Sequence, residues 1–170
     1  MQTQDIIGKI SGHWKLEVFD GDRPRDPETG LYVITRPLEV IEGENLVTTV
    51  GKGLLLDRLF NLGTPPTQVN SMGVGTVSTA AAVTDTQMNQ GGGGSSALQA
   101  FDSTPSRAGL VVTSVCTYAT GTANFAWAEL GMFNGTVNGT SLMLNRIAPI
   151  GPFTKSASVS IAVTVTLTQS

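Results

Sequence analysis

The chain has very little of the chemistry from which most active sites are built. Its 170 residues include one histidine, His13, and one cysteine, Cys116. A single cysteine excludes an internal disulfide, and a single histidine excludes a Cys/His zinc cluster within one chain. His13 is also the only base available for a Ser-His-Asp arrangement, and it lies in a segment that we expect to be peripheral. We therefore predict that the protein is not an enzyme, with no catalytic residues, metal or cofactor.

Charged residues are also scarce. Asp, Glu, Lys and Arg make up 14% of the chain, against about 25% in an average globular protein. The net charge of −3 argues against a nucleic-acid-binding protein, which would carry a basic patch. Gly, Ser, Thr and Asn supply the polarity instead, as in proteins that are secreted or largely buried against neighbours in an assembly.

Long apolar runs are absent from the sequence as well. No run approaches the roughly 18 residues that a membrane-spanning helix needs, so we expect no membrane partner. The first residues, MQTQDIIGKISGHW, lack the basic start and apolar core of a signal peptide, and we expect no secretory leader. The two NGT triplets at 134–136 and 138–140 are therefore interpreted as turns rather than glycosylation sites.

The glycine-rich and acidic segments do not match known ligand motifs. MGVGTVST at 72–79 lacks the third glycine of a dinucleotide fingerprint, and GKGLLLD at 51–57 lacks the Walker spacing. Acidic residues cluster between positions 20 and 28, but two arginines interleave with them, which disfavours a calcium site. That cluster consists of Asp20, Asp22, Arg23, Arg25, Asp26 and Glu28. We predict no small-molecule substrate.

What the chain does have is β-strand periodicity, above all from Gly109 onward. Strand-like segments cover 110–118, 125–133, 142–147 and 158–168, and the last has the cleanest alternation of apolar and hydroxyl residues. Several short strands at this spacing indicate a sandwich or barrel. We predict a mainly β protein: an antiparallel β-sandwich, jelly-roll-like or related.

The first part of the chain differs from the rest. Residues 1–50 hold nine of the thirteen acidic residues, and we interpret residues 1–45 as an N-terminal arm with short strands and a turn at 43–45. Residues 46–170 then form the core, interrupted by a long glycine-rich loop at 78–106. Leu55 and Leu59 are four residues apart, as on one helical face, and predict one short helix near 50–61.

One carboxylate stands in a strand that otherwise looks buried. Glu129 lies in NFAWAELGMFNG, where strict alternation places it on the same face as Trp127 and Phe133. A buried carboxylate needs a partner, a proton or an interface. Arg146 and Arg107 are the available cations, and a bidentate ion pair with either would hold strand register. An interface contact and a catalytic role are the alternatives, although no second acid, histidine or nucleophile falls near it in the pattern.

A series of motifs resembles a known group of proteins. In order they are NLVTTVGKGLLLDRLF, SMGVGTVSTAAAVTDTQM, FAWAELGMFNG, SLMLNRIAPI and SVSIAVTVTLT. This series resembles small virion structural proteins of tailed bacteriophages over Asn45 to Thr168. The resemblance implies a β-rich module on the virion without enzymatic activity, used in capsid decoration (cement) proteins and in tail or collar modules.

Two features favour a capsid cement protein among these: the chain is short, and it lacks the long repetitive shaft of a fibre. We expect a homotrimer that binds the major capsid protein and stabilises the shell, located in the virion and assembled in the bacterial host cytoplasm. A tail, neck, baseplate or fibre component is the first alternative. A receptor- or sugar-binding module, with Trp127 or Tyr118 as a stacking platform, is the second.

Contact residues are expected outside the apparent core, since Arg and aromatic residues often dominate interfaces. Some lie in the arm and the others flank the glycine-rich segment. They are Trp14, Phe19, Arg23, Arg25 and Tyr32 in the arm, with Met88 and Phe101 near the loop.

Overall fold

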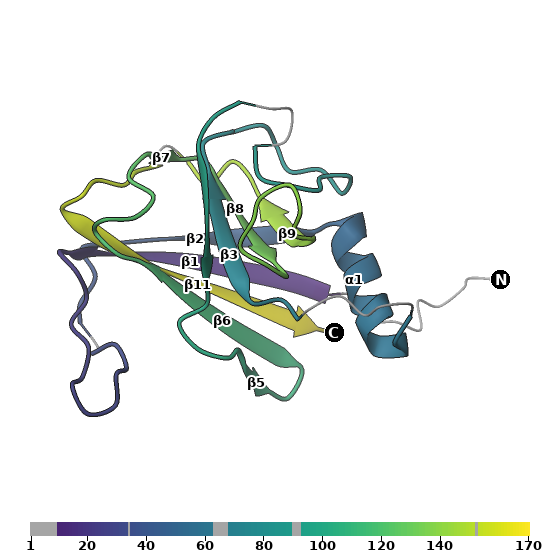
Figure 1. Ribbon diagram of the computed structural model, residues 1–170, viewed down its shortest axis with the longest axis horizontal. Coiled ribbons are helices and arrows are strands. Elements are labelled where there is room, and N and C mark those ends of the chain that lie inside the picture. Colours follow the sequence, from purple (N-terminus) through teal and green to yellow (C-terminus); the bar gives the residue numbers. More distant parts are fainter. Residues whose placement is uncertain (1–9, 34, 63–67, 90–92, 152) are drawn as a thin grey trace.

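The computed structural model describes residues 10–33, 35–62, 68–89, 93–151 and 153–170 (Figure 1). The described part of the chain is mainly β, with 46% of its residues in strands and bridges, and contains one helix. The strands are β1 (Ile10–Asp20), β2 (Glu39–Val47), β3 (Ser71–Gly75), β4 (Ser96–Ala100), β5 (Ser106–Ala108), β6 (Val111–Tyr118), β7 (Ala126–Trp127), β8 (Glu129–Phe133), β9 (Met143–Ile147), β10 (Phe153–Thr154) and β11 (Val159–Gln169), and the helix is α1 (Thr49–Phe60).

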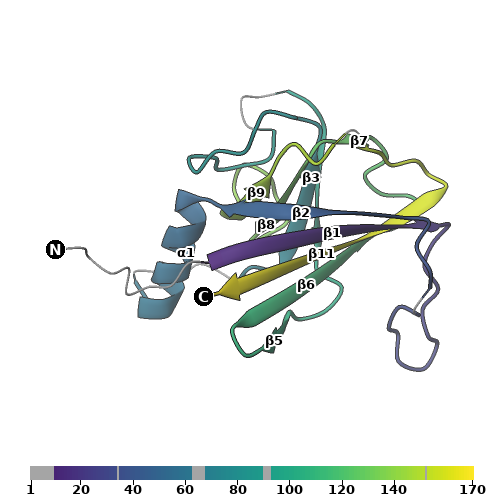
Figure 2. The same ribbon diagram turned by 180° about the vertical axis from the view of Figure 1, so that it is seen from behind.

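Nine strands form one antiparallel sheet in the order β4-β3-β8-β9-β2-β1-β11-β6-β5, while β7 and β10 pair separately. The large sheet curls into two layers (Figures 1 and 2). They are joined through the backbone where β2 pairs with β9, at Leu46 and Val47. The prediction of a mainly β, antiparallel and sandwich-like fold is confirmed.

The two layers enclose the main hydrophobic core. At the side opposite the β2–β9 pairing, the Tyr118 hydroxyl donates to the Met72 carbonyl at 2.7 Å and links the layers. Alternation in β6 and β11 turns one set of apolar side chains inward. Fully buried members of this core include Leu16, Met72, Val74, Cys116, Tyr118, Trp127, Leu130, Ile161 and Val163.

The interpretation of residues 1–45 as an arm outside the core is wrong for the part that the structure describes. β1 lies in the middle of the sheet, between β2 and β11, and its inward side chains Leu16 and Val18 belong to the main core. The predicted turn at 43–45 is continuous strand within β2. Residues 1–9 lie outside the described residues.

The segment 78–106 also differs from its prediction as one long loop. β4 lies within it and pairs with β3 along its whole length. The Thr76 N–H donates to the Ser95 carbonyl at 3.1 Å, and this bond joins the two ends of the segment 77–94. We call the described part of this segment the excursion. Residues 90–92, which include part of the glycine run, lie outside the described residues.

The predicted helix is present as α1. Thr48 is its N-cap: its hydroxyl oxygen accepts from Gly51 N at 3.0 Å, and its hydroxyl donates to the Met143 carbonyl at 2.9 Å. One side chain thus begins the helix and attaches it to β9. The helix buries Gly51 and Leu54, whereas Leu59 is largely exposed, so the leucine pair that predicted the helix is not its buried face.

Two glycines of α1 give a matched test of this packing. At Gly51 a β-carbon would overlap the Leu144 carbonyl oxygen, whereas no heavy atom lies within 4 Å of that position at Gly53. We expect Gly53→Ala to raise the free energy of unfolding by about 0.5–1 kcal/mol, because alanine favours the helix. Gly51→Ala should lower it by about 1–3 kcal/mol. Urea unfolding measures both, and equal effects would contradict the contact with β9.

Candidate functional site

The central polar feature is a buried network around Arg146 on β9. Its Nε donates to Glu129 Oε2 at 2.7 Å and its Nη1 to Asp85 Oδ2 at 2.7 Å. The side chains of Arg146 and Glu129 are fully buried and that of Asp85 nearly so. Glu129 and Arg146 therefore form the ion pair expected from the sequence, but through one hydrogen bond rather than a bidentate contact. The second contact of Arg146 is to Asp85, a partner that the sequence did not indicate.

The network fastens the excursion after β3 onto the sheet. Glu129 Oε1 accepts from the Asn89 N–H at 2.7 Å, and Asn89 Oδ1 accepts from the Thr76 N–H at 3.2 Å. Asp85 Oδ2 also accepts from Ala82 N at 2.8 Å. Carboxylate oxygens are thus shared between the arginine of β9 and backbone donors of the excursion. The described part of the excursion is therefore held by its own chain.

Glycines in the strands make space for this arrangement. Gly75 stands opposite Glu129 and Gly131 opposite Arg146 in the strand register. A β-carbon at Gly75 would overlap the Glu129 carboxylate, and one at Gly131 would lie 2.9 Å from the Asn145 carbonyl oxygen and 3.2 Å from the Met88 sulfur. Met88 is fully buried in a second small core with Phe133 and Met143. The glycines therefore allow the excursion to lie directly on the sheet.

The two acids of the network are paired with the same cation. One arginine faces two carboxylates at 2.7 Å each, so neither acid is free to act as a general base at an open site. Arg107, the other cation considered for Glu129, is exposed and donates to the Gly109 carbonyl. Burial, together with the nearby Asp102 carboxylate, raises the pKa of the Cys116 thiol well above its ordinary value, which leaves it a packed core residue.

The sequence alternation fails between Trp127 and Glu129. Trp127 packs edge-on against Tyr118 at 4.9 Å between ring centroids, inside the main core, whereas Glu129 and Phe133 lie on the opposite face of their layer, under the excursion. The cause is Ala128, whose N–H bonds to Gly75 and whose carbonyl accepts from Ile150 as the chain passes from one sheet to the other. Since Trp127 and Tyr118 are fully buried, neither offers the sugar-stacking platform that was considered.

The structure divides the expected contact residues into two groups. Trp14, Phe19 and Met88 are buried within the chain, so their prediction as surface contacts is wrong; the strand alternation of β1 turns Trp14 inward, and Phe19 is buried near the end of that strand. Phe101 is partly buried and packs against the main core. Of the three expected contact residues in the 21–38 segment, Arg25 is exposed and Arg23 and Tyr32 are partly buried.

That segment, which we call the 21–38 loop, carries an arginine–tyrosine stack. The Arg25 guanidinium lies 3.9 Å from the Tyr32 ring centroid, and Arg23 lies 4.8 Å from it. Arg25 Nη2 also donates to the Tyr32 hydroxyl at 2.7 Å. Cation–π stacking of this kind stiffens a loop at modest energy. Beside the stack, the loop exposes Leu31 and Leu38.

A second exposed apolar surface was not predicted. The C-terminal part of α1 exposes Leu56, Leu59 and Phe60, with Leu59 at 74% and Phe60 at 64%, and Leu62 is exposed just beyond the helix. We call these four residues the α1 patch. The available signal was the number of apolar residues in the helix, which exceeds what one buried stripe can hold. The α1 patch and the 21–38 loop lie at opposite ends of the molecule (Figure 1).

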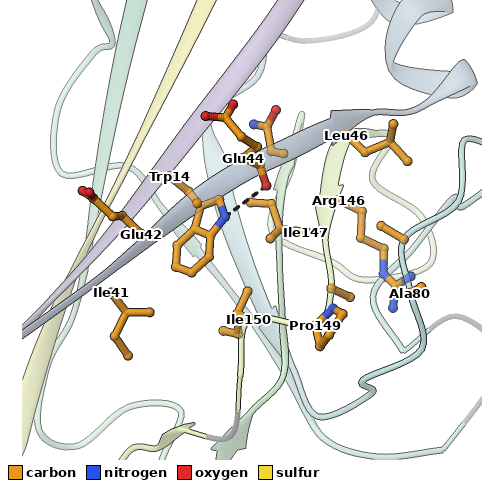
Figure 3. Close-up of a pocket in the computed structure, with 14 residues that line it drawn as sticks. Trp14, Ile41, Glu42, Glu44, Leu46, Ala80, Arg146, Ile147, Pro149 and Ile150 are labelled. Atoms are coloured by element: carbon orange, nitrogen blue, oxygen red, sulfur yellow. Dashed lines mark hydrogen bonds between the residues drawn. The ribbon is translucent and has the colours of Figure 1, made fainter.

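A pocket of about 570 Å³ opens where β2 and β9 diverge (Figure 3). Trp14 and Ile41 form one wall, and the segment around Pro149 and Ile150 forms the facing wall, with Arg146 at one end. The Trp14 indole N–H donates to the Glu44 carbonyl at 3.2 Å. The pocket therefore borders the backbone of β2.

The fold and the site together define a β-sandwich-like protein with a buried polar network around Arg146. No protein-family model, curated protein or solved structure matches the chain. The described helix is too short to cross a membrane. Within the described ranges, no group of three or more His, Cys, Asp and Glu side chains is placed to hold a metal ion.

Substitutions in the network should show how much its charged contacts contribute to the free energy of unfolding. Glu129→Gln should lower the free energy of unfolding by about 1–3 kcal/mol, because a charged hydrogen bond is replaced by a weaker contact. Arg146→Leu should cost about 3–5 kcal/mol, because two buried carboxylates lose their cation. Chemical denaturation gives both values, with exposed Glu28→Gln as control. Amide exchange between 78 and 89 should rise most, and unchanged protection there would argue against the fastening role.

The 21–38 loop should respond to acid. Asp22 accepts from the Thr120 N–H at 2.7 Å and from its hydroxyl at 3.0 Å, and these bonds lower the pKa of Asp22 below its ordinary value of 3.8. A lowered pKa stabilises the folded contact above that value, and the effect is lost as pH falls through the folded-state pKa. Protection of the Thr120 amide in hydrogen exchange should fall at such acidic pH. In Asp22→Asn this acid-dependent step should be missing.

Proposed function

We propose that the protein is a non-enzymatic structural protein of a tailed-bacteriophage virion, a decoration or cement protein that binds the major capsid shell. The observation that carries the assembly role is the α1 patch, where Leu59 and Phe60 are more than half exposed on a described surface helix. Exposed apolar clusters on a folded domain mark interaction sites. The ordered series of motifs from Asn45 to Thr168, which resembles virion structural proteins, supports the virion as the assembly.

The position of the two surfaces suits a protein that bridges neighbours. The α1 patch lies at one end of the molecule and the 21–38 loop at the other (Figure 1). One end would contact the shell and the other an adjacent copy, in the trimer that we expect. Each contact is small, and repetition over many copies would supply the strength that a single contact lacks.

The chemistry of the described residues supports a non-enzymatic role. His13 lies on β1 with its Nε2 4.0 Å from Glu42, and both side chains are well exposed. Cys116 is buried in the core, and Asp85 and Glu129 are held by Arg146. Among these groups there is no nucleophile beside a base in an enclosed site.

A tail, neck, baseplate or fibre component is the second candidate, since the same apolar surfaces would serve it. The two locations differ in stoichiometry, because a shell protein is present in many copies per particle and a tail component in few. Quantitative mass spectrometry of purified virions therefore decides between them.

The cement role predicts a specific defect. Particles without the protein should form, yet release DNA at lower temperature or lower salt than wild-type particles, because the shell loses its external contacts. Dye-detected DNA release against temperature measures this. Added wild-type protein should restore the particles, and Leu59→Glu/Phe60→Glu should not.

The matched control is Leu110→Glu, since Leu110 is 63% exposed and lies between β5 and β6, outside the α1 patch. This variant should restore stability as wild type does. Particles that are equally robust with and without the protein would exclude the cement role.

A further inference from the structure

The strand β2 has a free edge along most of its length. On one side it pairs with β1 from Glu39 to Asn45, whereas on the other it pairs with β9 only at Leu46 and Val47. No other described strand pairs with β2. The pocket of about 570 Å³ lies directly beside this unpaired stretch (Figure 3).

The hydrogen-bond register of β2 shows which of its backbone N–H and C=O groups face the pocket. The Thr48 N–H donates to the Leu144 carbonyl, which continues the register of Leu46 with Arg146. Since backbone groups alternate direction along an antiparallel strand, the N–H and C=O of Val40, Glu42 and Glu44 point away from β1. The Glu44 carbonyl already accepts from Trp14, which fits this phase. The edge therefore presents strand-type donors and acceptors at regular spacing.

The walls of the pocket suit an apolar side chain. Trp14 and Ile41 line one side, and Ile147 and Ile150 the other. A volume of about 570 Å³ lies within the roughly 300–1,000 Å³ of typical binding pockets. An extended peptide added to β2 would place alternate side chains toward the pocket, which is the arrangement of β-strand addition.

The charge of the edge selects among possible peptides. Glu39, Glu42 and Glu44 are all exposed on β2, and the only ion-pair contact of Glu42 in the described structure is exposed His13 at 4.0 Å. Arg146 at the end of the pocket is already neutralised by two carboxylates at 2.7 Å. An anionic segment would be repelled, whereas Lys or Arg on either side of the apolar residue would be attracted.

We propose that the free edge of β2 binds an extended, basic segment of a partner protein as an added strand, with an apolar side chain of that segment in the pocket beside Trp14. This interaction surface is separate from the α1 patch and the 21–38 loop, and it does not depend on the capsid assignment.

Three synthetic peptides test the proposal on the full chain. The first, Ac-GKVKIKVKG-amide, is basic and alternates; Ac-GEVEIEVEG-amide reverses its charge; Ac-GKVKPKVKG-amide removes a central N–H and the apolar side chain. Only the first should bind, detected by fluorescence of Trp14 and by NMR shifts of the amides of Glu42 and Glu44. Its affinity should fall with added salt, because the rim charges are exposed.

Variants of the edge complete the test. Glu42→Pro removes an outward N–H at a position where an edge strand tolerates proline, and it should abolish binding while thermal unfolding shows an intact fold. Glu44→Lys should weaken binding about tenfold through charge reversal at the rim. Glu28→Lys, the same change in the 21–38 loop, should leave it unaltered.

Several outcomes would overturn the proposal. They are equal binding of the basic and acidic peptides, binding that survives Glu42→Pro, shifts that map to α1, and no binding of any peptide. Self-association of the protein that Glu42→Pro abolishes would make a second copy the occupant, and would likewise refute a basic partner segment. Because the experiment uses the isolated protein, its failure is distinct from failure of the virion assignment.

Discussion

The paired contacts of Arg146 are the interaction on which one layer of the molecule depends. Its guanidinium joins β9, β8 and the excursion after β3 through Glu129 and Asp85. Residues 51–170 contain four acidic residues, and two of them meet this one arginine. In a low-charge chain, such a network is a specific connection that apolar packing alone does not supply. Buried ion pairs add little net stability and act best as determinants of geometry.

The network also explains why the excursion can lie on the sheet. Gly75 and Gly131 remove the side chains that would stand in its way, and Met88 fills the space beside Phe133. The ion pairs, the two glycines and the buried methionine act together, so that Met88 of the excursion becomes part of the second core. The excursion is thus packed within its own chain, whereas Leu59 and Phe60 of α1, Leu31 of the 21–38 loop and Glu42 of β2 are exposed.

Local sequence patterns predicted which segments form helix or strand better than they predicted where each segment lies in the fold. The helix α1 follows from the spacing of its leucines, and β11 follows from alternation over many residues. Patterns of this length are not easily overridden by contacts with the rest of the chain. The acidic residues of the first part suggested a separate arm, yet Glu39, Glu42 and Glu44 are the exposed side chains of a strand in the main sheet. Glu129 needed a cation, and sequence offered two arginines; only the pairing of β8 with β9 selects Arg146. Asp85 comes from a segment without periodicity, so no pattern could place it.

The central pairing of the sheet joins β1 with β11, from Ile10 with Gln169 to Asp20 with Val159. The two strands come from opposite ends of the described chain. Contacts so distant in sequence slow folding, because a long loop must close before they form. During synthesis β1 therefore lacks this neighbour until β11 has been made. A chain that ends before β11 therefore leaves open an edge of β1 that β11 covers from Ile10 to Asp20 in the folded protein.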